Sequence, residues 1–356
     1  MKDVYNVGFV GFGMIGKVHA YGYLTLPLYY QPVPLRARIT HVCTTRQETA
    51  EAGASLIGAP HAVTDYRLVT ENPSVDIVHI CTPNDRHKEA LLSAMRHQKH
   101  IYCDKPLVAT LAEAEEIQAA LESYRGTAQM TLQNRFFPAT MRAKQLVEEG
   151  FLGKPLEFRA AYLHSGSADP NAPLKWKLRA GVIADLGPHV FDIIYYLLGE
   201  FAAIQTLTFL AYPQRGGAED CMMALVRMKN GSVGTIEATK LATGSEDELR
   251  FEIHGSRGAL RFNGMDAHHL EAYDVKTGGW TRIDTGQRYA PPAAPFPGPK
   301  FAIGWLRGHV ACLAQFLQAV ANGQPGDPGL QHGIYLQRVL DCAQRSAREQ
   351  RWVNIE

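Results

Sequence analysis

The residues best suited to chemistry begin with a lysine at the end of a short apolar run. The run His100–Cys103 is followed at once by Asp104, Lys105 and Pro106. A lysine there carries a point charge with three donors, which can hold and polarise a hydroxyl or carbonyl oxygen. Since ligands of open α/β sheets bind beyond the carboxyl ends of the strands, the pattern predicts a substrate-orienting Lys105. The alternative is a surface lysine paired with Asp104.

A second set of candidate residues combines a histidine with two carboxylates. Asp185, His189 and Asp192 are spaced i, i+4 and i+7, so on a helix they share one face. Carboxylates beside a histidine fix its tautomer and raise its proton affinity, which suits a general base. The segment alone leaves another interpretation open, in which Asp185 caps the helix and His189 is a core residue. Together with a lysine, such a base could remove the hydroxyl proton of an alcohol during hydride transfer.

A glycine pattern indicates where the hydride acceptor would bind. Gly11, Gly13 and Gly16, with Met14 and Ile15 between the last two, lie between an apolar strand and a helix. The first glycine permits a tight turn, the second lets backbone approach a pyrophosphate, and the third lets the helix pack on the strand. In a chain of alternating strands and helices this pattern predicts a dinucleotide site. The alternative is a glycine-rich turn that binds nothing.

The end of the second predicted strand bears on the choice between NAD and NADP. Thr44, Thr45 and Arg46 stand where an acid would hold the adenosine 2′-hydroxyl. Two hydroxyls and an arginine tolerate a 2′-phosphate, so this stretch favours NADP over NAD. In the alternative interpretation Thr44 caps the next helix and Arg46 is merely solvated.

The predicted secondary-structure elements that position these residues show two different sequence patterns. Through about residue 130, apolar strands alternate with helical patterns, which predicts an α/β fold with a doubly wound parallel sheet. The predicted elements are strands Val4–Val10, Arg38–Cys43, Val75–Cys81 and His100–Cys103 and helices Met14–Leu26, Arg46–Ile57, Asp85–Arg96 and Leu111–Tyr124.

Past residue 155 the pattern changes to hairpins, with turns at Asn230-Gly231 and between Gly255 and Gly258, followed by two closing helices. We therefore predict a dinucleotide-binding domain over 1–130 and an α+β domain with a largely antiparallel open sheet over 131–356. The proline-rich residues 286–304 could form a lid or an oligomer arm.

Composition excludes several classes of protein. A chain of 356 residues with 46% hydrophobic residues and a formal charge of +1 has no charge excess that would attract nucleic acid or a membrane surface. Its longest apolar stretch, Val190–Leu198, is far shorter than the roughly 20 residues of a membrane span. Six cysteines without C-x-x-C spacing indicate neither a zinc site nor a disulfide framework, so we predict no metal. With no targeting signal, we expect a cytoplasmic protein.

Several motifs together resemble the Gfo/Idh/MocA oxidoreductases, named for glucose-fructose oxidoreductase, inositol dehydrogenase and a rhizopine catabolism protein. They are GFGMIGKVHA, TPNDRH, DKP in place of the usual EKP, QNRF, Trp176-Lys177, D-x-G-x-H-x-x-D and a closing LLG. The resemblance covers essentially the whole chain. It implies an N-terminal Rossmann domain and a C-terminal α/β domain whose open sheet builds homodimers or homotetramers.

The resemblance also implies roles for individual residues. Lys105 would orient the substrate, Asp185 and His189 would complete the catalytic set with His189 as base, and Asp192 would support the histidine. Residues near the nicotinamide and its ribose would be Thr82, Pro83, Asn84, His87, Asp104 and Asn134. Asp104 is one methylene shorter than the usual glutamate, which shortens its reach to the cofactor.

The resemblance implies a sugar, an inositol or a sugar derivative as the substrate. Candidates for the sugar-facing wall are Tyr162, His164, Lys175, Trp176 and Lys177, for each of which plain packing or surface charge is an equal alternative.

Three functions are compatible with this framework. The first is an NAD(P)-dependent dehydrogenase of a secondary alcohol. The second is an NAD-dependent glycosidase that oxidises a hydroxyl transiently, eliminates and returns the hydride without net redox change. The third, a nucleotide-sensing regulator, is disfavoured because Lys105, Asp185 and His189 are all present.

Overall fold

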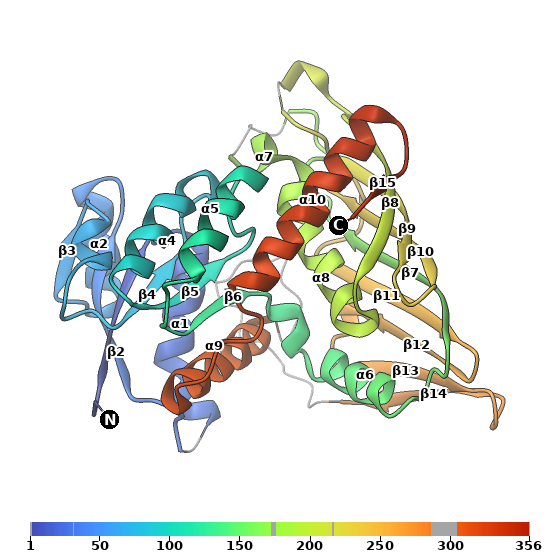
Figure 1. Ribbon diagram of the computed structural model, residues 1–356, viewed down its shortest axis with the longest axis horizontal. Coiled ribbons are helices and arrows are strands. Elements are labelled where there is room, and N and C mark those ends of the chain that lie inside the picture. Colours follow the sequence, from blue (N-terminus) through green and yellow to red (C-terminus); the bar gives the residue numbers. More distant parts are fainter. Residues whose placement is uncertain (1, 31, 172–175, 216, 286–304, 356) are drawn as a thin grey trace. The chain divides into compact units, whose positions relative to one another are not determined.

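The computed structural model describes residues 2–30, 32–171, 176–215, 217–285 and 305–355 (Figure 1). These residues form two compact units. Unit 1 comprises Met1–Gln133 and Leu306–Gln337, and unit 2 comprises Asn134–Trp305 and Arg338–Glu356. The predicted domain ranges, 1–130 and 131–356, remain a proposal. The proline-rich residues 286–304 lie outside the described ranges.

Unit 1 is built on a six-stranded parallel sheet with the strand order β3-β2-β1-β4-β5-β6. The strands are β1 (Tyr5–Val10), β2 (Ala37–Cys43), β3 (His61–Val63), β4 (Ile77–Ile80), β5 (His100–Asp104) and β6 (Ala128–Thr131). Apart from the short strand β3, their central side chains are almost completely buried, which explains the continuous apolar runs in the sequence. This sheet confirms the predicted doubly wound fold. The sequence patterns did not identify β3 and β6, which are only three and four residues long.

The helices of unit 1 connect the strands and cover the sheet. They are α1 (Met14–Tyr29), α2 (Gln47–Ile57), α3 (Arg67–Thr70), the 3-10 turn η1 (Asn84–Arg86), α4 (His87–Arg96), α5 (Leu111–Leu121) and α9 (Trp305–Asn322). Thr110 and Glu113 form a capping box that fixes the start of α5. Helix α4 contacts α5, whereas α1 approaches α9 at Gly22 and Leu313. A distant part of the chain thus completes this unit.

Unit 2 is built on a nine-stranded sheet with the order β14-β13-β12-β11-β7-β10-β9-β8-β15. All its neighbouring strands are antiparallel except β10 and β7. The strands are β7 (Pro155–Leu163), β8 (Phe201–Phe209), β9 (Cys221–Met228), β10 (Val233–Thr239), β11 (Glu248–Gly255), β12 (Gly258–Asn263), β13 (His269–Asp274), β14 (Gly279–Asp284) and β15 (Val353–Asn354). Both predicted hairpins, β9–β10 and β11–β12, are present.

Helices lie along one face of this sheet (Figure 1). They are α6 (Pro138–Glu148), α7 (Trp176–Asp185), α8 (Gly187–Leu198) and α10 (Leu330–Glu349), and the short turns are η2 (Gln133–Phe136), η3 (Pro213–Arg215) and η4 (Gly264–Asp266). The opposite face exposes apolar side chains at alternating positions, including Leu207, Phe209, Met223, Leu225 and Val233. A hollow of about 1090 Å³ lies on that face. No helix among the described residues has both the length and the apolar character that crossing a membrane requires.

Candidate active site

The glycine loop between β1 and α1 leaves room for backbone to approach a ligand. Gly11 has a φ of +92°, and a Cβ there would lie 2.6 Å from the carbonyl carbon of Cys81. At Gly16 a Cβ would lie 2.8 Å from the oxygen of Gly11, so helix and loop pack closely. A Cβ on Gly13, the N-cap of α1, would meet nothing within 4 Å. The loop and helix N-terminus thus fit a pyrophosphate.

Two hydroxyl groups and a guanidinium follow β2, near the glycine loop, on Thr44, Thr45 and Arg46. The hydroxyl of Thr44 donates to the backbone oxygen of Arg46 at 2.9 Å and lies 2.5 Å from that of Thr49. Thr44 contacts the turn before α2 without capping the helix, because its hydroxyl donates to a carbonyl and Arg46 holds the N-cap position. Thr45 and Arg46 are exposed, and Arg46 occupies the N-cap position of α2.

The ends of β4 and β5 are tied together by His87. Its Nε2 lies 2.7 Å from the oxygen of Thr82, and its Nδ1 lies 3.1 and 3.0 Å from the oxygens of Pro106 and Leu107. Because the side chain is fully buried, no ring atom of His87 is available to a cofactor. The ring holds two loops together, and the expectation that His87 lies along the nicotinamide remains a prediction.

Other predicted residues at these strand ends remain accessible. Asp104 and Lys105 are partly exposed, and the Lys105–Pro106 bond is cis. Pro83 is exposed, whereas the Nδ2 of Asn84 lies 3.4 Å from the oxygen of Val108. The buried hydroxyl of Thr82 has no hydrogen-bond partner among the described residues. The first unit thus presents hydroxyl, amide and ammonium groups at neighbouring strand ends.

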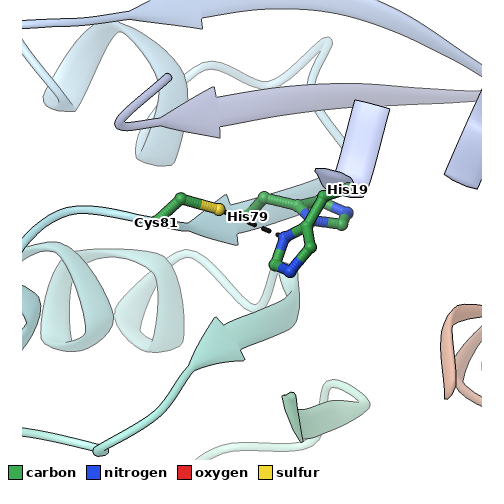
Figure 2. Close-up of side chains that lie close together, drawn as sticks. All are labelled: His19, His79 and Cys81. Atoms are coloured by element: carbon green, nitrogen blue, oxygen red, sulfur yellow. Dashed lines mark hydrogen bonds between the residues drawn. The ribbon is translucent and has the colours of Figure 1, made fainter. Parts of the chain in front are cut away.

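Next to the glycine loop, His19, His79 and Cys81 form a largely buried group (Figure 2). The Nδ1 of His19 lies 3.1 Å from the Nδ1 of His79 and 3.2 Å from the sulfur of Cys81. On the other side of each ring, the hydroxyl of Tyr23 lies 2.8 Å from the Nε2 of His79, and that of Thr131 lies 3.4 Å from the Nε2 of His19. Each ring nitrogen of His19 and His79 therefore has a hydrogen-bonding neighbour.

The pKa values of His19, His79 and Cys81 indicate that these side chains are neutral and linked by hydrogen bonds. Burial lowers the pKa of His19 to about 3, lowers the pKa of His79 and raises the pKa of the Cys81 thiol. All three groups are then neutral near pH 7, and N–H, O–H and S–H donors account for their contacts. The absence of a metal remains a prediction.

In unit 2, the predicted catalytic segment is divided between two helices. Asp185 ends α7 and His189 lies in the first turn of α8, with Leu186 between the helices. A single uninterrupted helix was the wrong expectation, because Pro188 lacks the amide donor needed within a helix and is accommodated only in a first turn. Helical bonding nevertheless bridges the break, since Leu186 donates to Val182 and His189 donates to Leu186.

A second kink precedes Asp185. Gly181 has a φ of +79°, and a Cβ there would lie 2.2 Å from Oε1 of Glu219. The amide of Ile183 donates to that oxygen at 3.1 Å, and the amide of Val182 donates to the backbone oxygen of Glu219. Burial raises the pKa of Glu219. The glycine is therefore required for the buried acid to approach the turn before Asp185.

The side chains around Asp185 and His189 come from the strands beneath them. Nζ of Lys240, the residue after β10, lies 3.2 Å from Oδ2 of Asp185, and both side chains are buried. The ring of Tyr162 meets the ring of His189 edge to face at 5.5 Å. Tyr162 also donates its hydroxyl to Asp247 at 2.6 Å. Through these contacts the two predicted catalytic residues, Asp185 and His189, are connected to the buried Lys240 and Asp247.

Two predicted wall residues share this environment. His164 has a partly exposed side chain, and its Nε2 lies 3.0 Å from Oδ1 of Asp247. Tyr162 is buried, and burial together with Asp247 and then Asp185 raises the pKa of its phenol, which therefore remains a donor. Tyr162 supports the site from below, and His164 is the accessible member of the pair. Lys175 lies outside the described residues, and the side chains of Trp176 and Lys177 are not described.

Asp192 and Asn134 are both buried, and their expected roles in the site remain predictions. The carboxylate of Asp192 accepts hydrogen bonds from Arg135 at 2.5 to 3.0 Å. This ion pair gives Asp192 a structural function, and its support of His189 remains a prediction. Asn134 is buried, and its Nδ2 has no hydrogen-bond partner within the described ranges.

Sequence reasoning missed Lys240, Asp247 and Glu219 as parts of this site. The available signal was positional: Lys240 immediately follows the alternating strand β10, Asp247 immediately precedes β11, and Glu219 lies two residues before β9. Charged residues at strand ends are too common for that signal to select these three.

The parallel sheet and its glycine loop define a dinucleotide-binding oxidoreductase domain, and comparisons with known proteins agree. Residues 5–132 match the oxidoreductase family with an NAD-binding Rossmann fold, and residues 140–261 match the GFO/IDH/MocA C-terminal domain. The chain therefore belongs to the Gfo/Idh/MocA family of NAD-binding oxidoreductases.

Individual relatives extend this likeness over the full chain. Levoglucosan dehydrogenase of Pseudarthrobacter phenanthrenivorans is 30% identical over 381 residues, with 98% of each chain covered. Inositol 2-dehydrogenase of Rhizobium meliloti is 27% identical over 358 residues, also with 98% of each chain covered. Levoglucosan dehydrogenase in complex with NADH and levoglucosan has a similar structure, with a TM-score of 0.91 at 31% identity and 99% of each chain covered.

Proposed function

We propose that the protein is an NAD(P)-dependent dehydrogenase that oxidises a secondary alcohol of a sugar, an inositol or a sugar derivative. The observation that carries this proposal is the buried acid–base group around His189 and Asp185, in a chain whose other unit has a dinucleotide loop. Relatives that cover the full chain and are named for levoglucosan and inositol support the substrate class.

The bound nicotinamide would supply the hydride acceptor. His189 would take the hydroxyl proton as the carbon–hydrogen bond breaks and the carbonyl forms. Lys105 would donate a hydrogen bond to the reacting oxygen and hold it in one orientation. Asp185, kept beside Lys240, would accept a hydrogen bond from the substrate and favour the imidazolium form of His189.

For the cofactor, we propose that the site accepts NADP as well as NAD. The exposed side chains of Thr45 and Arg46 leave the adenosine-ribose position without an acid that would repel a 2′-phosphate. The ratio of kcat/KM for the two cofactors measures this preference directly. An Arg46→Asp variant should lose NADP activity selectively, with NAD activity as the internal control.

The decisive experiment for the function is a screen of levoglucosan, myo-inositol, scyllo-inositol and common aldoses with each cofactor, followed at the nicotinamide absorbance. Continuous formation of reduced cofactor with a free polyol is the expected result. Turnover of a glycoside without a change in that absorbance would instead support the redox-neutral glycosidase. Cofactor binding without turnover of any of these compounds would refute both enzymatic proposals and favour the sensor.

For the assembly, we propose that a second copy of this chain covers the open sheet face of unit 2. The exposed Leu207, Met223 and Leu225 are more apolar than a solvated sheet face requires. Light scattering coupled to size-exclusion chromatography should give a dimer or tetramer. Met223→Glu together with Leu225→Lys should shift it toward the monomer, whereas a persistent monomer in the wild type would contradict the proposal.

A further inference from the structure

Lys240 is a buried cation held at a fixed position in unit 2. Its backbone amide donates to the oxygen of Asp220 at 2.9 Å, and its own oxygen accepts from the amide of Ser167 at 2.8 Å. The side chain is 8% exposed and its Nζ lies 3.2 Å from Oδ2 of Asp185, which is 10% exposed. The two backbone bonds and the ion pair together determine where the ammonium lies.

Packing alone gives no reason for a lysine at this position. Taking two charges out of water is unfavourable, and replacing both partners of a buried ion pair by apolar side chains of similar volume is often neutral or stabilising. An apolar pair could therefore occupy the positions of Lys240 and Asp185. The buried charge of Lys240 indicates a role in the chemistry of its partner, Asp185.

The surroundings of Asp185 show why a cation is needed. Among the described residues, the titratable groups on this part of the unit include His189 from α8, Tyr162 from β7, Glu219 before β9, Asp247 before β11 and Lys240 after β10. Tyr162 stays protonated, and Glu219 accepts a hydrogen bond from the backbone of α7. Lys240 is a positive group placed to keep a buried carboxylate at Asp185 charged.

We propose that Lys240 is a positioning residue that keeps Asp185 ionised and oriented beside His189. This inference rests on the proposed function and adds a third residue to its acid–base group. Lys240 acts through Asp185, because an ionised Asp185 can accept a substrate hydroxyl and stabilise the imidazolium that forms on His189. A protonated Asp185 would be a weaker hydrogen-bond acceptor for the substrate hydroxyl and would stabilise the imidazolium less.

The test compares Lys240→Met, which removes the charge, with Lys240→Arg, which keeps it. An opposite charge within hydrogen-bonding distance lowers a carboxyl pKa by about 1–3 units. In Lys240→Met the carboxyl titration of Asp185 should therefore move up by about 1–3 pH units, and Lys240→Arg should restore most of its original position. The matched control is Lys229→Met in the turn between β9 and β10, where the lysine forms an exposed pair with Glu200.

Two readouts keep this inference separate from the proposed function. The carboxyl titration of Asp185, followed by carbon NMR with labelled aspartate and assigned through Asp185→Asn, requires no substrate. If the wild type oxidises no polyol, the proposed function fails and the titration still tests Lys240. A structural role alone would lower thermal stability and reduce activity equally at every pH. An unmoved Asp185 titration in folded Lys240→Met would overturn the inference.

Discussion

The buried ion pair between Arg135 and Asp192 provides a quantitative test of how unit 2 holds α8. Nε of Arg135 lies 3.0 and 2.9 Å from the two carboxylate oxygens, and the side chains are 8% and 1% exposed. The guanidinium also lies 5.0 Å from the ring centroid of Tyr196. Replacing Arg135 by methionine leaves the buried carboxylate without its cation, so the free energy of unfolding should fall by about 3–5 kcal/mol.

The double variant distinguishes the uncompensated charge from lost packing. In Arg135→Met/Asp192→Leu both charges are absent, and an apolar pair can replace a buried ion pair at little cost. We expect the double variant to lie within about 1–2 kcal/mol of the wild type, and it should therefore be more stable than Arg135→Met. The single variant should therefore be the least stable of the set.

Urea unfolding followed by tryptophan fluorescence gives the free energies, and hydrogen exchange in α8 assigns the change to unit 2. The exposed pair between Arg142 and Glu149 is the control, because an exposed pair contributes about 0–1 kcal/mol. A loss below about 1 kcal/mol in Arg135→Met, or a double variant no more stable than the single, would refute the reasoning.

Three further predictions concern the site. Lys105→Ala should bind NAD nearly as the wild type does, by fluorescence titration, yet lose about 10²–10⁴-fold in kcat; an unchanged kcat would remove Lys105 from the mechanism. His19 has its pKa lowered from 6.5 to about 3 by burial, so its stabilising contribution is complete above pH 6.5 and is lost as pH falls toward 3. Between pH 7 and pH 4 the wild type should lose about 3 kcal/mol of its free energy of unfolding through His19, and a folded His19→Gln variant should not show this part of the loss. If acid lowered the free energy of unfolding of the wild type and of His19→Gln equally, the low pKa assigned to His19 would be contradicted. Dialysis against a chelator should leave both activity and unfolding midpoint unchanged, and recovery of lost activity by added zinc would show that His19, His79 and Cys81 bind a metal.

The sequence by itself determined the architecture of unit 1 and both hairpins of unit 2, because those features depend on local patterns. The glycines at 11, 13 and 16 mark the turn between β1 and α1, and continuous apolar runs mark buried parallel strands. The turn at Asn230-Gly231 fixes the register of β9 and β10 in the same way. The short strands β3 and β6 carry too few residues for periodicity to distinguish them from loops.

Tertiary structure alone decided how charged groups pair. His87 and Asn84 are neighbours of the same motif, yet the fold buries the ring of His87 among three backbone oxygens. Lys240 meets Asp185 across 55 positions of the sequence, and Tyr162 meets Asp247 across 85. No local periodicity encodes such contacts, because the packing of a helix on a sheet determines which strand ends lie beneath Asp185. The sequence thus determined which residues could do chemistry, and the tertiary structure decided which of them share a charge environment.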